Sequence, residues 1–242
     1  MTTVYLDEVD VSQLSLSDLK FVKYSSAVSS DSNIRLKGHH EARILYGDNK
    51  SRCLIVFENT MVPFGVQCKP PDKPRSKYYG TIDINTSPEQ SAHVTAIEEQ
   101  LFTLARQTQL PFSYPAEKKL VRQGRIKSTA PDGTVERWPD MLKFQVPLST
   151  NYETKKPRVV YDTMQNPVYV VDRKQVKVFY ADSEVDFPEH NFKMTRFNHV
   201  YIWLKTVKFC AKNGVRIVGE LVQLEVPEYA PCKPPKRRRV AV

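Results

Sequence analysis

The stretch VYIWLKTVKFCAKNGVRIVGELVQLEV, residues 200–226, decides the fold of this chain. Val200 to Leu204 and Val215 to Val226 are rich in β-branched and aromatic residues, which favour strands. Between them stands Asn213-Gly214, a dipeptide typical of tight hairpin turns because their central positions need positive φ angles. We therefore predict two long antiparallel strands joined by a turn at residues 213–214.

Shorter strand signals precede this hairpin. The continuous apolar run Cys53 to Phe57 predicts a strand buried on both faces. Leu142, Phe144 and Val146 alternate with polar neighbours, which predicts a half-buried strand with Lys143 facing outward. The turn sequence Ala130 to Gly133 indicates a hairpin between its flanking strands. Further strands are predicted at residues 21–24, 33–36, 78–84, 124–129, 134–138, 168–171 and 176–180, the last two as a pair.

One helix stands out between these strands. Ser87 is a good N-cap, Pro88 suits the first helical position, and Gln90 completes a capping box. Apolar residues then recur at helical spacing and form one stripe: Val94, Ile97, Leu101 and Leu104. We predict an amphipathic helix near 88–108 that packs against a sheet.

These elements predict a mainly β fold with one helix, either a compact barrel or a β-sandwich. Residues 1–20 are predicted to form an N-terminal arm or edge strand, and residues 21–227 a single β-rich domain. Residues 228–242 are expected to be a disordered basic tail, since Lys233 to Arg239 has no means of packing.

The charge balance points to an anionic partner. There are 36 Lys and Arg against 27 Asp and Glu, a net charge of +9 and a pI of about 9.3. Such a surface favours nucleic acid, anionic membrane or acidic proteins. Neither a secretory signal nor a membrane-spanning run is found. The cysteines at positions 53, 68, 210 and 232 are predicted to be reduced thiols of an intracellular protein.

Motifs for catalysis are missing from the sequence. His39-His40-Glu41 lacks a second histidine at helical spacing, and no phosphate-binding loop or nucleophile elbow occurs. We expect no enzyme activity, no cofactor and no metal.

Basic residues interleaved with aromatics give the better signal. Single-strand binders combine cations along the phosphates with aromatic faces for unstacked bases. In a strand, Arg125 and Lys127 share one face while Ile126 packs inward; in a loop, the three side chains need not alternate in this way. Trp138 and Tyr79 adjoin turns and are the favoured stacking residues, Phe144 is assigned to the core, and Trp203 is left open between core and ligand. The candidate nucleic-acid-binding residues are Arg75, Lys77, Tyr79, Arg122, Arg125, Lys127, Trp138, Lys143, Lys155 and Lys156.

The tail carries a separate signal. Lys236, Arg237, Arg238 and Arg239 resemble a nuclear localisation signal, and the alternative is a general polyanion anchor.

Several short motifs occur in order over residues 50–226. They are Met61 to Gly65, Lys77-Tyr78, Asp132-Gly133, Pro139, Leu142 to Phe144, Ile202-Trp203, Phe209, Gly214 and Leu221 to Leu224. Together they resemble a family of proposed single-stranded DNA-binding proteins in large nucleocytoplasmic DNA viruses. The resemblance implies an OB-fold-like barrel, similar to phage single-stranded DNA-binding proteins, that serves viral DNA replication or repair. Those phage proteins end in an acidic tail that recruits partners, whereas this tail is basic.

The leading hypothesis is sequence-independent binding of single-stranded DNA in viral replication, repair or recombination. RNA as ligand, self-association and contacts with viral replication or virion proteins stay open; no membrane contact is expected. The alternative is a virion structural protein, a minor capsid or core component that meets DNA or acidic partners. The expected location is accordingly the host nucleus, a viral replication site or the virion.

Overall fold

The predicted C-terminal hairpin forms the longest pair of strands in the described chain. The computed structural model describes residues 1–23, 38–67, 79–110, 112–154, 156–161, 167–172, 174–180, 183–184, 195–211 and 213–226. Strands β17 (Thr195–Cys210) and β18 (Gly214–Val226) pair antiparallel along their lengths. Gly214 has a φ of 78°, and a Cβ there would lie 2.1 Å from the Ala116 carbonyl oxygen, so only glycine fits this turn.

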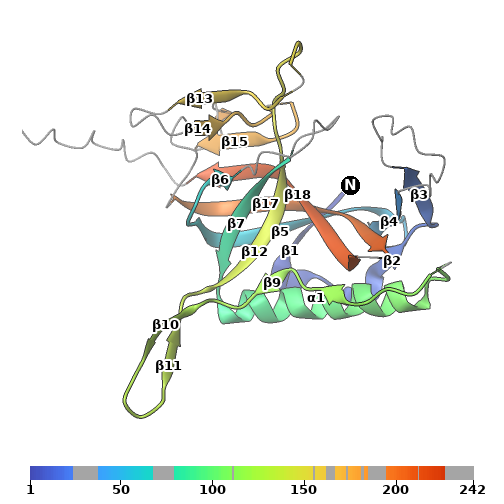
Figure 1. The fold of residues 1–242 in the computed structure, drawn as a ribbon, viewed down its shortest axis with the longest axis horizontal. Coiled ribbons are helices and arrows are strands. Elements are labelled where there is room, and N and C mark those ends of the chain that lie inside the picture. The colour runs from blue at the N-terminus through green and yellow to red at the C-terminus, as the bar shows by residue number, and fades with distance from the viewer. Residues whose placement is uncertain are drawn as a thin grey trace, which may run out of the picture.

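Five strands close into a ring. In addition to β17 and β18, they are β5 (Ser51–Val62), β7 (Tyr79–Thr86) and β12 (Asp140–Pro147). The ring runs β5-β7-β12-β18-β17 and returns to β5, and only the β12–β18 pairing is parallel. In chain order this is 1-2-3-5-4-1, the arrangement of an OB-fold barrel (Figure 1). The chain is therefore mainly β, as the sequence predicted.

Shorter strands extend the ring at its margins. Strand β1 (Thr2–Tyr5) pairs with β5, β6 (Val66–Gln67) with β7, β8 (Glu117–Lys118) with β18, and β9 (Val121–Arg122) with β12. Strand β4 (Gly38–Tyr46) joins β17 and carries β2 (Leu14–Leu16) and β3 (Lys20–Lys23). Strand β15 (Lys177–Tyr180) joins β18 and carries β16 (Ser183–Glu184). The single-turn helices η1 (Leu6–Glu8) and η2 (Val11–Gln13) lie between β1 and β2.

Two hairpins stand apart from the main sheet. One consists of β10 (Ile126–Thr129) and β11 (Val135–Arg137), the other of β13 (Val159–Tyr161) and β14 (Pro167–Tyr169). They project from opposite ends of the barrel (Figure 1).

Helix α1 (Pro88–Gln107) lies across the end of the barrel from which β10 and β11 project (Figure 1). The predicted capping box forms, because Ser87 accepts from the Gln90 backbone N–H and the Gln90 side chain accepts from Ser87. Val94, Ile97 and Leu101 are buried, which confirms the predicted apolar stripe. No helix in the described residues has the length and apolar character needed to span a membrane.

The core fills the interior of this ring. The Phe57 and Phe144 rings lie 5.8 Å apart between centroids, which confirms the assignment of Phe144 to the core. The whole run Cys53 to Phe57 is buried, as predicted for a strand covered on both faces. Cys53 is a buried free thiol and Cys210 is half-buried; Cys68 and Cys232 lie outside the described residues.

Two structural expectations need correction. Ile126 does not pack inward: its hairpin has no layer beneath it and its side chain is 55% exposed. Residues 168–171 and 176–180 do not pair with each other, because β14 pairs with β13 while β15 lies parallel to β18. Residues 1–20 were predicted to form an arm or edge strand; β1 pairs with β5 there, and Leu6 and Leu14 belong to the core. The predicted strand at residues 33–36 and the tail at 228–242 lie outside the described residues.

Candidate nucleic-acid interface

The described structure includes the side chains of six predicted binding residues. These are Arg122, Arg125, Lys127, Trp138, Lys143 and Lys156. The backbone of Tyr79 belongs to β7. Arg75, Lys77, Lys155 and the tail residues Lys236, Arg237, Arg238 and Arg239 lie outside the described residues.

The β10–β11 hairpin is a fixed arm rather than a loose loop. At its base the Trp138 N–H donates to the Arg125 carbonyl oxygen at 2.9 Å, and the Gly124 N–H donates to the Asp140 carboxylate at 2.9 Å. A Cβ on Gly124 would lie 1.6 Å from the Trp138 carbonyl oxygen, so the two segments approach as closely as backbone allows. The arm therefore leaves the barrel in a defined direction.

Trp138 is the exposed aromatic of this arm. Its side chain is 56% exposed, which confirms the expectation from its position beside a turn. The Lys127 ammonium lies 5.5 Å from the centre of the indole ring. A cation over an exposed indole ring suits a site where a base stacks and its phosphate lies alongside.

The charge of the arm is partly balanced within it. Lys127 pairs with Glu136 at 2.6 Å, and hydrogen bonds from Lys127 and then Ser128 lower the pKa of Glu136. Arg125 makes no ion pair with any described residue. Arg125 is thus the arm cation most available to a phosphate.

The arm continues into the outward face of β12. Arg122 on β9 lies opposite Met141 on β12. Lys143 lies two residues further along β12 and therefore on the same outward face. The alternating residues Leu142 and Phe144 point into the core. Lys143 faces outward as predicted but forms an ion pair with Asp83 of β7 at 3.6 Å. No local sequence pattern indicates that pair, which leaves Arg122 as the cation of this face without an ion-pair partner among the described residues.

Lys156 is not brought to this surface. The backbone N–H of Asn151 donates to the Lys156 carbonyl oxygen at 2.8 Å. This bond places Lys156 next to the β13–β14 hairpin. That hairpin lies at the opposite end of the barrel from the arm (Figure 1). The structure therefore brings together Arg122, Arg125, Lys127, Trp138 and Lys143, and separates Lys156 from them.

A cavity of about 430 Å³ lies beside the base of the arm, between β5, the end of β7 and the start of α1. Its lining includes the carboxylates Asp7, Glu58 and Glu89, together with Arg196. Carboxylates repel phosphate, so this cavity does not extend the basic surface. Within the described residues, no group of three or more His, Cys, Asp or Glu side chains could hold a metal ion.

Sequence reasoning missed a second group of cations on the outward face of β17 and its neighbours. Arg52, Lys205, Lys208 and Arg216 come from three different strands, so no run in the sequence groups them. The available signal was the alternation of Tyr201, Trp203 and Lys205, which places all three on one face.

Comparison with known proteins adds no relative. No protein-family model matches the chain, and no curated protein matches it significantly.

Proposed function

We propose that this protein binds single-stranded nucleic acid without sequence preference. The surface consists of Arg122, Arg125, Lys127, Trp138 and Lys143, named here the arm face. The observation that carries the proposal is the exposed Trp138 indole with the Lys127 ammonium over its ring, on a fixed arm that continues into an OB-type barrel. The strand 2–3 face of such barrels, here β7 and β12, binds oligonucleotides in other proteins.

Two physical terms account for such binding. Cations attract phosphates and release counterions, which makes the affinity dependent on salt. Base stacking on an aromatic ring adds about 1–3 kcal/mol per base to the binding free energy. It requires bases that are not already stacked within a duplex. Because every base has a π-face, neither term requires a particular sequence.

The biological setting rests on the family resemblance of the sequence. It favours DNA as the ligand and viral DNA replication, repair or recombination as the process. A host nucleus or viral replication site would be the corresponding location. A virion structural role remains the alternative, and a fixed high copy number in purified particles would favour it.

Trp138→Ala tests this function at its central residue. We expect the substitution to remove about 1–3 kcal/mol of single-strand binding free energy at high salt, where stacking outweighs charge. Trp138→Phe should retain most of the affinity, and Val135→Ala on the same arm serves as the control for local disturbance. Fluorescence anisotropy with labelled oligonucleotides measures all three. Equal affinity of Trp138→Ala and the unaltered protein would remove Trp138 from the interface.

A further inference from the structure

A second aromatic and basic surface lies on the outward side of β4, β5, β17 and β18. At its centre is Trp203, with the Arg52 guanidinium carbon 4.8 Å and the Lys205 ammonium 4.9 Å from the ring centre. Trp203 pairs across from Leu54 on β5 and Glu220 on β18. The Trp203 face, as we call it, consists of Arg43, Arg52, Trp203, Lys205, Lys208 and Arg216, with the carboxylates of Glu41 and Glu220.

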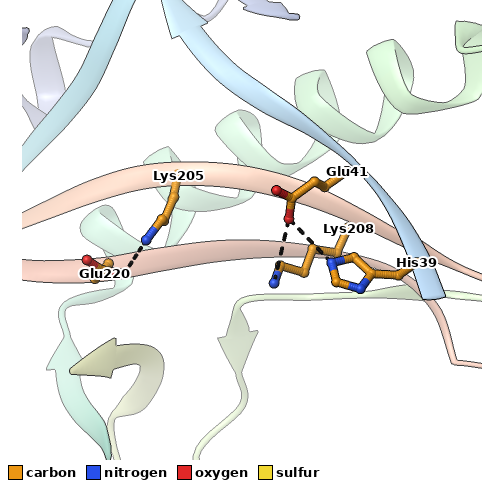
Figure 2. Close-up of polar contacts among 5 residues, drawn as sticks. All are labelled: His39, Glu41, Lys205, Lys208 and Glu220. Carbon is orange, nitrogen blue, oxygen red and sulfur yellow. Dashed lines mark hydrogen bonds and ion pairs between the residues drawn. The ribbon is translucent and has the colours of Figure 1, made fainter. Parts of the chain in front are cut away.

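The carboxylates of this face are already engaged. Glu220 is buried and accepts from Lys205 at 2.7 Å, while Glu41 lies 3.7 Å from Lys208 and 3.3 Å from His39 (Figure 2). Arg43, Arg52 and Arg216 form no ion pair with a described residue. Five cations against two carboxylates leave the Trp203 face with a positive charge available to an anion.

The Arg52 side chain has a particular geometry. Its guanidinium lies over the indole of Trp203, so the ring holds the cation in place and leaves it without a carboxylate partner. Unstacked bases stack on arginine planes as well as on aromatic rings. A planar platform of this kind fits a nucleobase better than it fits an aspartate or glutamate side chain.

The Trp203 face is continuous with the arm face. Gln145 of β12 pairs with Glu220 of β18, and Glu220 pairs with Trp203 of β17, so the three residues form one row across the barrel. Neighbouring strands lie about 4.8 Å apart, which separates the backbones of Gln145 and Trp203 by only about 10 Å. Lys143 of the arm face lies two residues from Gln145 on the same side of β12.

We propose that one nucleic-acid strand extends from the arm face across β18 and binds a second time on the Trp203 face. This inference rests on the proposed single-strand binding and assigns its path and extent. A strand held on both faces occupies more of the barrel than a strand held on the arm face alone. A short oligonucleotide occupies one face only, whereas a long one reaches both.

The two tryptophans of the chain report the two faces separately. Trp138→Phe leaves Trp203 as the only tryptophan, and Trp203→Phe leaves Trp138 as the only one, so the tryptophan emission of each variant reports one face. Each variant is titrated to saturation with oligo(dT) of about 8 and of about 30 nucleotides. Single OB folds bind about 4–16 nucleotides, so the shorter oligonucleotide lies within this range and the longer one exceeds it. We expect the long oligonucleotide to quench Trp203 and the short one to quench it much less.

A charge variant tests the same path through affinity. Arg52→Ala with Arg216→Ala should weaken binding of the long oligonucleotide at least about fivefold and change binding of the short one less than about twofold. Arg52→Lys, which keeps the charge but loses the plane, should weaken it by an intermediate amount. Unchanged circular dichroism and melting show that these variants are folded.

The outcomes separate the two proposals. Quenching of Trp138 with no change at Trp203 would overturn the second contact and leave the arm face standing. No binding by either variant or by the unaltered protein would overturn both proposals. Equal quenching of Trp203 by a polyglutamate peptide would also overturn the assignment, because it would mark the Trp203 face as a site for acidic protein.

Discussion

At the scale of single residues, Glu98 shows how a buried carboxyl group can position a surface. Its side chain is 1% exposed on α1, and one carboxylate oxygen accepts the backbone N–H of Leu120. Burial raises the pKa of Glu98, opposed by the backbone N–H groups of Leu120 and Val121. This contact fixes the segment that leads through β9 to the arm.

Replacement of Glu98 should therefore depend on whether the acceptor survives. Glu98→Ala leaves the Leu120 N–H buried without a partner, and we expect it to lower the unfolding free energy by about 1–3 kcal/mol. Glu98→Gln keeps an acceptor oxygen for the Leu120 N–H, so it should cost less than Glu98→Ala. Urea denaturation of the three proteins measures the difference. An equal loss in both variants would show that the charge itself, not the acceptor, matters.

At the scale of elements, the β10–β11 arm concentrates predicted binding residues on a hairpin without a core. The hairpin itself was predictable from the sequence, because Ala130 to Gly133 is a strong turn sequence between two short strands. The side-chain packing was not, since Ile126 has no partner layer to cover it. Ile126, Val135 and Trp138 are exposed there, and exposed apolar side chains beside cations suit a partner surface.

The arm cations should determine part of the salt dependence. For a single strand, each phosphate contact contributes about 0.7 to the steepness of log affinity against log salt concentration. The double variant Arg125→Ala with Lys127→Ala should therefore reduce the steepness of this slope by up to about 1.4. Arg125→Ala alone should account for more than half, because Lys127 is already paired with Glu136. Glu136→Gln is the matched control and should raise affinity by freeing Lys127. An unchanged slope in the double variant would remove both cations from the interface.

At the scale of the whole molecule, the sequence predicted elements better than their assembly. Local alternation identified the β17–β18 hairpin, and capping residues identified α1. The β12–β18 pairing that closes the ring joins segments about 75 residues apart, and no local pattern specifies such a contact. The predicted pairing of residues 168–171 with 176–180 was wrong for the same reason: β14 pairs with β13, and β15 pairs with the distant β18.

The binding surface was predictable to a similar degree. Turn proximity correctly indicated that Trp138 is exposed, and alternation correctly turned Lys143 outward. The Lys143–Asp83 ion pair and the Trp203 face depend on which strands become neighbours across the ring. Only the assembled barrel shows them.

The barrel should also lose stability in mild acid. Burial, followed by the positive charge of Lys208, lowers the pKa of His39 below its ordinary 6.5, although Glu41 opposes the shift. As pH falls below about 6.5, the unfolded chain binds a proton that the folded chain resists, so stability decreases with falling pH. Between about pH 7.5 and about pH 5.5, we expect the unfolding free energy of His39→Gln to fall less than that of the unaltered protein. Urea titrations at both pH values measure the difference. The same pH dependence in both proteins would exclude His39 as its source.

The most direct test of single-strand binding is a titration with labelled single-stranded and duplex oligonucleotides of one sequence, at low and high salt. Stacking on Trp138 requires unpaired bases, so we expect tight single-strand binding that partly survives high salt and much weaker duplex binding. Equal affinity for both forms, abolished by salt, would contradict the proposal. It would show a merely cationic surface and favour the virion structural role instead.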